Sequence, residues 1–301
     1  MPTGGARGPT AIILNEGAGN ARAPHVRRAI EATRRLLDAD LHVTETRDPA
    51  TLAAWLRATL PVDAPYATVV VAGGDGTLSV AYNVLADRDL AIGYLPAGFG
   101  NATRHLLRLP RDSDAQAAVI AAGDARPVDM LSVNGHLALF AGAGWDARVA
   151  DRYARAGARR LPGWAAAVTR SVPDLFRRPT VRVVVDGATI HHGPMELLVA
   201  GTTPFFGRGL QVNPGARTDA GRLMLRVYTG PAPALAMEAM RWATRRRPRA
   251  VGHAAQVAEL HVEGGEGIPV QADGDVIGTD RQWRFEVRPG AIRLIGHWQQ
   301  R

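Results

Sequence analysis

The chain has 301 residues, 46% of them hydrophobic, and a formal net charge of +8 at pH 7. It contains no cysteine, which excludes disulfides, thiolate nucleophiles and cysteine-ligated metals. All 36 basic residues are arginine, which excludes Walker-type phosphate loops and lysine Schiff bases. Any phosphate chemistry must therefore use backbone amides, arginine, carboxylates and metal ions.

The length predicts two domains. No stretch approaches the ~20 apolar residues of a membrane span, and residues 1–9 lack the apolar core of a signal peptide, so the expected location is cytoplasmic. The positive charge has two interpretations. The first is an acidic partner, either nucleic acid or anionic lipid. The second is a generally arginine-rich composition, in which the charge carries little information about function.

Short apolar strands alternate with helices over the first 100 residues. The predicted strands are Thr10–Asn15, Leu41–Thr46, Val69–Ala72 and Leu90–Leu95, and the predicted helices are Ala23–Asp38, one starting at Asp48-Pro49 and one after Gly76. This alternation predicts a parallel sheet covered by helices on both faces, with ligands at the carboxyl ends of the strands. Four loops converge on that edge, at Asn15, Thr46, Gly73–Thr77 and Gly98–Asn101.

Short alternating runs separated by Gly and Pro dominate after about residue 129, which predicts a β-sandwich. Asp151–Arg178 and Met237–Arg247 are expected to be helical, and Arg284–Ile295 is expected to form a late strand pair. The predicted domains are therefore 1–130, an α/β nucleotide-binding domain, and 131–301, a sandwich. The segment of about 285–301 is expected to return to the first domain.

Gly73-Gly74-Asp75-Gly76-Thr77 is the strongest motif in the chain. A buried strand precedes it and a helix follows, so free N–H groups and the positive end of a helix dipole meet in one loop and favour phosphate binding. A structural turn of this kind usually needs one glycine at positive φ, whereas three clustered glycines let a ligand approach the backbone. Asp75 is suited to a magnesium-bound water, and Thr77 to capping the helix and touching phosphate.

Two further motifs are weaker alone. Pro96-Ala-Gly-Phe-Gly-Asn101 follows the next strand, and Asn101 suits either a helix N-cap or a ligand contact. Asp273-Gly274-Asp275 places two carboxylates together late in the chain, although Asp-Gly is also a common hairpin dipeptide.

The order of Asn15, the two glycine loops and Asp273-Gly274-Asp275 resembles the diacylglycerol kinase catalytic-domain family, in particular the bacterial YegS-like lipid kinases. The resemblance runs from about Thr10 to the C-terminus and includes the segments Asn213–Gly221 and Leu223–Gly230. It implies a phosphofructokinase-like α/β N-terminal domain and a β-sandwich second domain, with ATP and the lipid in the cleft between them. The Asp151–Arg178 region would border the acyl chains.

The resemblance also implies residue roles. Asp273-Gly274-Asp275 matches the family's Asp-Gly-Glu, so Asp275 is the implied general base, with Asp273 beside it. Mg²⁺ is implied at Asp75, and at Asp219 next to Ala220, which replaces the family's metal-binding Asp. The residues implied to contact ATP are Asn15, Thr46, Gly73, Gly74, Asp75, Gly76, Thr77, Leu78, Ser79, Gly98, Phe99, Gly100 and Asn101.

The chain departs from the family pattern at Glu16, Asn20, Phe99, Ala102 and Ala220. These departures keep open a catalytically weak lipid-binding or regulatory module. NAD kinase is a second alternative because it shares the Gly-Gly-Asp-Gly loop, but the second glycine loop and the late Asp-Gly-Asp argue against it. The favoured prediction is an ATP-dependent lipid kinase that transfers the γ-phosphate to the hydroxyl of a diacylglycerol-like lipid. The lipid and the oligomeric state stay open.

A basic cluster lies near the end of the predicted helix Met237–Arg247. It comprises Arg241, Arg245, Arg246, Arg247 and Arg249, with no acidic residue between Glu238 and Glu259. With Trp242 and Met240 nearby, it suits peripheral contact with anionic headgroups, or equally a solvated face. Nucleic-acid binding has no support, because no binding module or stacking platform is recognisable.

Overall fold

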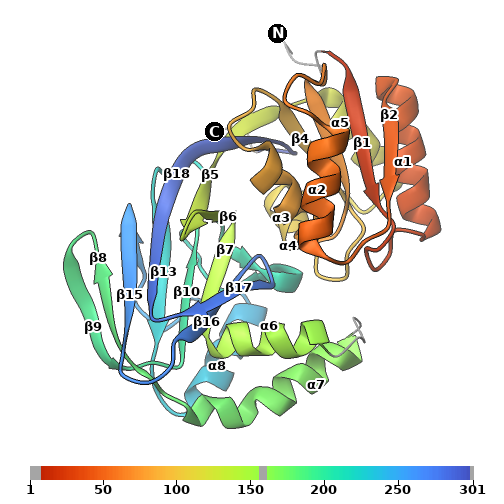
Figure 1. The fold of residues 1–301 in the computed structure, drawn as a ribbon. Coiled ribbons are helices and arrows are strands. Elements are labelled where there is room, and N and C mark those ends of the chain that lie inside the picture. The colour runs from red at the N-terminus through yellow and green to blue at the C-terminus, as the bar shows by residue number, and fades with distance from the viewer. Residues whose placement is uncertain (1–7, 156–160, 299–301) are drawn as a thin grey trace. The chain divides into compact units, whose positions relative to one another are not determined.

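The computed structural model describes residues 8–155 and 161–298 (Figure 1). Residues 1–7, 156–160 and 299–301 lie outside the described residues. They are parts of the N-terminal stretch 1–9, of the predicted helical segment Asp151–Arg178 and of the C-terminal segment of about 285–301. The chain divides into two compact units, Met1–Val128 with Gly290–Arg301, and Asp129–Pro289. Among the described residues, no helix has both the length and the apolar character needed to cross a bilayer.

The first unit is built on a parallel sheet. Its strands lie in the order β2 (Asp40–Thr44), β1 (Thr10–Asn15), β3 (Thr68–Gly73) and β4 (Ala91–Pro96). Every residue of β1 and β3 is buried, as expected for central strands covered on both faces. Their carboxyl ends, Asn15 and Gly73, therefore reach the same edge of the sheet.

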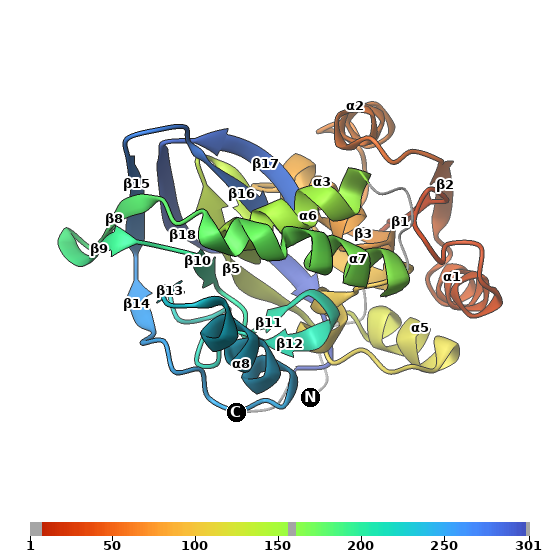
Figure 2. The same cartoon turned by 90° about the horizontal axis from the view of Figure 1, so that it is seen from below.

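Helices cover both faces of this sheet. They are α1 (Pro24–Leu37), α2 (Pro49–Thr59), α3 (Asp75–Leu85), α4 (Ala102–Leu106) and α5 (Ser113–Ala122). Figure 2 shows α1 and α5 on one face and α2 and α3 on the other. Ile12 and Val70 point to the first face, where they form a core with Ile30 of α1 and Ile120 of α5.

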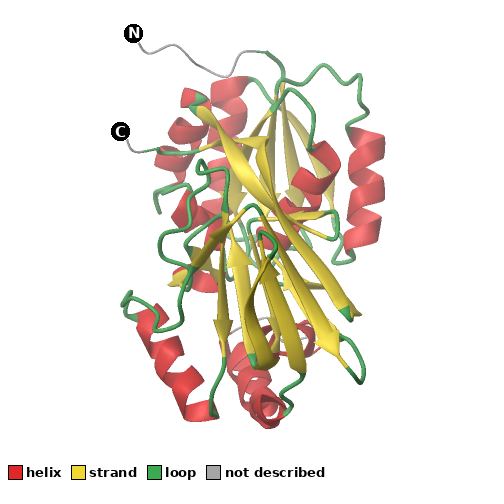
Figure 3. Cartoon of the chain, turned by 90° about the vertical axis from the view of Figure 1, so that its left-hand side faces the viewer, coloured by secondary structure: helices red, strands yellow, loops and turns green. Residues whose placement is uncertain are grey.

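The second unit is an antiparallel β-sandwich (Figure 3). One sheet has the order β14-β13-β10-β7-β16-β17, and the other contains β5, β6, β15, β8, β9 and the first part of β18. Apolar side chains from both sheets form one core, for example Leu198, Leu225, Leu260 and Phe285. The strands are β5 (Ala125–Val133), β6 (His136–Ala138), β7 (Phe140–Gly144), β8 (Thr180–Val185), β9 (Ala188–Pro194), β10 (Leu197–Gly201), β11 (Phe205–Phe206), β12 (Leu210–Gln211), β13 (Leu223–Tyr228), β14 (His253–Ala255), β15 (Val257–Glu263), β16 (Ile268–Ala272), β17 (Asp275–Asp280) and β18 (Gln282–Ile295).

Helical segments complete the second unit. They are α6 (Trp145–Arg155), α7 (Leu161–Ser171), the 3₁₀ turns η1 (Val172–Phe176) and η2 (Gly207–Gly209), and α8 (Ala232–Ala243). α6 packs on β7, β16 and β17, whereas α8 packs against η1 and β12. The predicted fold class, an α/β domain followed by a β-sandwich, is thus confirmed.

Three predicted boundaries were wrong. Arg284–Ile295 belongs to one long strand, β18, and not to a strand pair. Its first part pairs antiparallel with β15, whereas Arg293 and Leu294 pair in parallel with β4. The helix predicted at Met237–Arg247 is α8, which starts and ends earlier, and Arg245 has a left-handed backbone (φ 56°) that a helix cannot contain. The second strand ends at Thr44, so Thr46 lies in the following loop.

Candidate active site

The first glycine loop joins the buried strand β3 to helix α3. Gly74 precedes the first helical residue, Asp75, with an extended backbone (φ −86°, ψ 177°). The Leu78 N–H donates to Gly74 O at 3.0 Å and closes the first helical turn. The N–H groups before it have no intrahelical acceptor, and the helix dipole adds partial positive charge at the same place. This local arrangement attracts phosphate.

Close packing is what requires glycine in the two loops. None of Gly73, Gly74 and Gly98 has a positive φ. A Cβ on Gly73 would lie 2.5 Å from Thr77 Cβ, and a Cβ on Gly98 would lie 2.8 Å from Gly74 Cα. The two glycine loops therefore pack backbone against backbone. Sequence reasoning assigned the glycines to ligand approach and missed this contact, which no local pattern could reveal.

Asp75 joins the first glycine loop to the second. Its Oδ2 accepts the N–H of Ala102 at 2.8 Å and its Oδ1 accepts the N–H of Thr103 at 3.2 Å, so the carboxylate caps α4. Burial raises the pKa of the Asp75 carboxyl, and these hydrogen bonds oppose the rise. The hydroxyls of Thr103 and Tyr94 also hydrogen-bond to this carboxylate. The metal-binding role predicted for Asp75 stays a prediction.

Asn15 connects three of the predicted loops. Its Nδ2 donates to Thr77 Oγ1 at 3.2 Å, and its Oδ1 accepts the N–H groups of Gly17 at 3.0 Å and Thr46 at 3.2 Å. Asn15 is only 4% exposed, so its amide makes these hydrogen bonds from a buried position beneath the loops. The loops that were expected to converge at the sheet edge are thus brought together by this side chain and by Asp75.

Two departures from the family pattern also hold the loops together. The Asn20 N–H donates to Ala97 O at 2.7 Å, and its Nδ2 donates to Gly98 O at 3.1 Å. Phe99 packs over Gly19, where an added Cβ would lie 2.2 Å from the phenyl ring. Asn20 and Phe99 therefore fasten the turn after β1 to the second glycine loop.

The second loop differs from the N-cap expectation at Asn101. This residue precedes α4 with a left-handed backbone (φ 47°), but its side chain makes no cap hydrogen bond. Its amide instead turns back to Gly98, accepting the N–H at 3.0 Å and donating to the carbonyl at 2.8 Å, and Oδ1 also accepts the Tyr94 hydroxyl. The cap of α4 is supplied by Asp75.

The other predicted ATP contacts lie in the first turns of α3 and before α2. Thr77, Leu78 and Ser79 are buried in the first turns of α3, so the Leu78 side chain belongs to the core. Thr77 lies inside the helix, where its hydroxyl pairs with Asn15, and does not cap it. The Thr46 hydroxyl accepts the N–H of Asp48 at 3.1 Å, next to the start of α2.

Asp273-Gly274-Asp275 forms the hairpin turn between β16 and β17 in the second unit. Asp273 (φ 50°) and Gly274 (φ 98°) both have positive φ, as a two-residue hairpin turn requires. The Asp273 carboxylate is buried, and its Oδ1 accepts the N–H groups of Leu139 and Phe140, both at 3.1 Å. Asp275 is exposed at the start of β17. The two predicted catalytic carboxylates therefore have different environments.

Asp146 and Gln271 support this turn, and sequence reasoning missed both. Gln271 Nε2 donates to Asp146 Oδ2 at 2.7 Å, while Gln271 Oε1 accepts the Gly274 N–H at 2.7 Å. Burial raises the pKa of Asp146 to about 6, although the hydrogen bond from Gln271 acts in the opposite direction. The available signal was Gly142-Ala-Gly144 before α6, a glycine-containing strand followed by an acidic first helical turn.

Asp219, the other predicted metal ligand, forms a two-point ion pair with Arg217, at 2.9 Å to Nε and 3.1 Å to Nη2. Asp129 organises the same loop by donating its N–H to Thr218 O and accepting the Gly221 N–H, both at 2.7 Å. Within 8–155 and 161–298, no three His, Asp or Glu side chains gather as a metal site. Arg217 pairs with the Asp219 carboxylate at the surface, and the metal-binding role predicted for Asp219 stays a prediction.

Fold and loops define a class of protein with an α/β unit, which carries two glycine loops at a helix N-terminus, and a β-sandwich, which carries a carboxylate turn. Residues 9–133 match the family model of the diacylglycerol kinase catalytic domain, and residues 140–296 match that of the YegS C-terminal NAD kinase beta sandwich-like domain. The chain belongs to the YegS-like branch of the diacylglycerol kinase catalytic-domain family.

Individual relatives are distant but extend over most of the chain. A probable lipid kinase, YegS-like, from Klebsiella pneumoniae (strain 342) is 24% identical over 294 residues, 95% of each protein. Another so described, from Pseudomonas aeruginosa, is 29% identical over 244 residues, 77% of each. Two solved structures share the fold alone. A diacylglycerol kinase from Bacillus anthracis str. Sterne has a TM-score of 0.75 at 18% identity, covering 97% of this chain and 98% of that one. An NAD kinase from Archaeoglobus fulgidus in complex with ATP has a TM-score of 0.51 at 15% identity, covering 95% and 92%.

We predict that Gly98→Ala destabilises the first unit and weakens ATP binding. The new Cβ would press on Gly74 Cα and Asn101 Oδ1, each 2.8 Å away, and overpacking of this kind costs about 1–3 kcal/mol. Thermal unfolding and calorimetric ATP titration measure the two effects. Gly207→Ala is the matched control, because nothing lies within 4 Å of its added Cβ. Unchanged stability and ATP affinity in Gly98→Ala would contradict the packing argument.

A second prediction concerns the pH dependence of stability. The folded state raises the pKa of Asp146 from 3.8 to about 6, so ionisation opposes folding, and the contribution of this group is lost as pH rises through about 6. Asp146→Asn removes the titration and keeps an oxygen acceptor for Gln271. Urea unfolding from pH 4 to pH 8 should show wild type losing stability relative to the variant as pH rises. A pH-independent difference between the two proteins would count against a raised pKa.

Proposed function

We propose that the protein is an ATP-dependent lipid kinase that transfers the γ-phosphate of ATP to the hydroxyl of a diacylglycerol-like lipid. The observation that carries the proposal is the pair of interlocked glycine loops at the N-terminus of α3. Membership of the diacylglycerol kinase catalytic-domain family supports it, as do the relatives described as probable lipid kinases.

In this proposal the first unit binds the ATP phosphates. The N–H groups at the start of α3 supply hydrogen bonds and partial positive charge without any lysine. Mg²⁺ bound to ATP would neutralise part of the phosphate charge, and Asp75 is the carboxylate of the loop that we assign to it. Because Asp75 and Asn15 fix the loops, the phosphates meet a preorganised surface, which is what phosphoryl transfer requires of the protein.

The acceptor side of the reaction is assigned to the Asp273-Gly274-Asp275 turn. Asp275 is exposed and is proposed as the general base that takes the proton from the lipid hydroxyl. Asp273 is engaged with two backbone N–H groups, so it holds the turn in place. Asp146 acts on the same turn through Gln271, which makes it a positioning residue.

The test is a labelled-ATP transfer assay with the full chain against a panel of diacylglycerol, monoacylglycerol, phosphatidylglycerol, sphingoid bases, ceramide and NAD, with products identified by mass spectrometry. We expect transfer to a lipid. Transfer to NAD alone would favour the NAD kinase alternative. MgATP binding without turnover on any acceptor would favour a regulatory lipid-binding protein.

Asp275→Ala is predicted to lower turnover on the accepted lipid by about 10²–10⁴-fold, the usual contribution of a general base. The MgATP affinity should stay unchanged, because ATP is assigned to the first unit, and thermal unfolding establishes that the variant is folded. Glu266→Gln, an exposed carboxylate in the loop between β15 and β16, is the control and should keep full turnover. Undiminished turnover in Asp275→Ala would refute its role.

A further inference from the structure

Helix α8 exposes an uncharged, apolar face. Leu235, Glu238 and Trp242 point into the second unit and are at most 7% exposed. On the opposite face Met237 is 44% exposed and Met240 is 69% exposed. The remaining exposed positions of this face are Pro233, Ala236, Ala239 and Ala243. Trp242 is thus a core residue and does not belong to the exposed surface, contrary to the grouping that the sequence suggested.

The exposed face of α8 differs from that of another surface helix in the same chain. α1 places charged side chains outward, with Arg27, Arg28, Glu31, Arg34 and Arg35 all exposed. A solvated helix normally carries such a polar face. α8 lacks one until its last turn, so its outer face is suited to surroundings that are less polar than water.

A chain of exposed arginines follows α8 directly and is held against the helix. Arg245, Arg246 and Arg247 are exposed. The Arg241 side chain donates through Nε to Arg247 O at 2.8 Å, and Arg246 N–H donates to Arg241 O at 2.8 Å. The segment therefore folds back over the end of the helix, so the arginines and the methionine face belong to one rigid surface.

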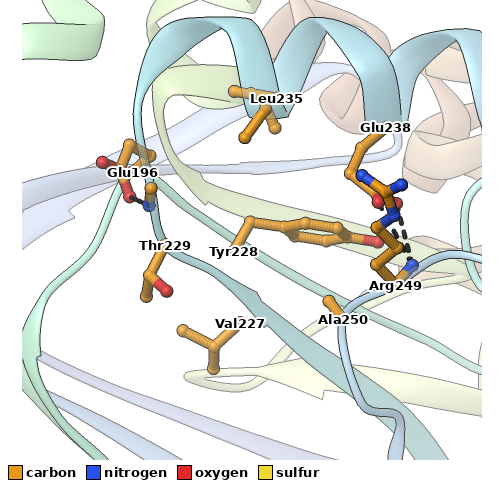
Figure 4. Close-up of a pocket in the computed structure, with 10 residues that line it drawn as sticks. Glu196, Val227, Tyr228, Thr229, Leu235, Glu238, Arg249 and Ala250 are labelled. Carbon is orange, nitrogen blue, oxygen red and sulfur yellow. Dashed lines mark hydrogen bonds between the residues drawn. The ribbon is translucent and has the colours of Figure 1, made fainter.

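A buried glutamate fixes the other end of this segment. Glu238 lines a pocket of about 280 Å³ between α8 and β13, and its carboxylate accepts the Arg249 N–H at 3.1 and 3.2 Å (Figure 4). Glu238 is 6% exposed, and its carboxylate also forms an ion pair with Arg241 at 3.9 Å. Val251, which is 70% exposed, extends the apolar part beyond Arg249.

We propose that Met237, Met240 and Arg245–Arg247 form a docking surface for an anionic lipid bilayer. Apolar side chains of an interfacial helix enter the boundary between headgroups and acyl chains, while neighbouring arginines pair with lipid phosphates. Charge complementarity selects an anionic bilayer, because the surface segment from 239 to 258 contains no acidic residue. The docking itself does not depend on the proposed kinase activity.

The experiment is co-sedimentation of the full chain with vesicles. One set contains 30% phosphatidylglycerol in phosphatidylcholine and the other contains phosphatidylcholine alone. We expect at least tenfold tighter binding to the anionic vesicles, weakening as NaCl is raised because salt screens exposed charges. Equal binding to both sets, or no binding to either, would overturn the proposal.

Two variants locate the surface. Met237→Asp with Met240→Asp should weaken binding to the anionic vesicles at least tenfold, and its control is Val62→Asp, an 85% exposed apolar residue of the first unit. Arg245→Gln with Arg246→Gln and Arg247→Gln should do the same. Its control removes the same charge from the exposed Arg34, Arg35 and Arg57.

Circular dichroism and thermal unfolding establish that each variant is folded. Wild-type vesicle binding by both the methionine variant and the arginine variant would overturn the assignment, and so would equal loss in the controls. The lipid-panel assay is independent of this measurement, so vesicle binding without phosphoryl transfer would leave the docking surface standing while the kinase proposal fails.

Discussion

One carboxylate holds the two glycine loops together. Asp75 starts α3 and at the same time accepts the first two N–H groups of α4, so a single side chain links the loops after two neighbouring strands. The cost of burying it is visible in its raised pKa. Without an acceptor, the buried N–H groups of Ala102 and Thr103 would each cost about 1–3 kcal/mol. The geometry of both loops therefore depends on Asp75.

The rest of the loop cluster is built around that link. Glycine at 74 and 98 lets the two backbones come close enough for the carboxylate to span them. Asn15 holds the first turn of α3 through its hydrogen bond to Thr77, and Asn20 holds the second glycine loop through its hydrogen bond to Gly98 O. Asn20 and Phe99 depart from the family pattern, but both make contacts that hold this cluster together.

Periodicity and glycine spacing were enough to predict the fold class and the convergence of loops, because strand ends and helix starts are local signals. The same signals could not reveal Gln271 or Asp146, which are 125 residues apart and meet only after the sandwich has formed. They also could not separate Asp273 from Asp275. The difference between a buried and an exposed carboxylate in one turn comes from Leu139 and Phe140, far away in sequence.

The hydrogen bonds of Gln271 run in one direction only. The Gly274 N–H can only donate, so it fixes Oε1 toward the turn and leaves Nε2 facing Asp146. A glutamate at position 271 would present acceptors at both ends and set two carboxylates against each other. Asp146 therefore influences the turn by orienting Gln271. Position 271 therefore needs a side chain with both a donor and an acceptor, which glutamine provides and glutamate does not.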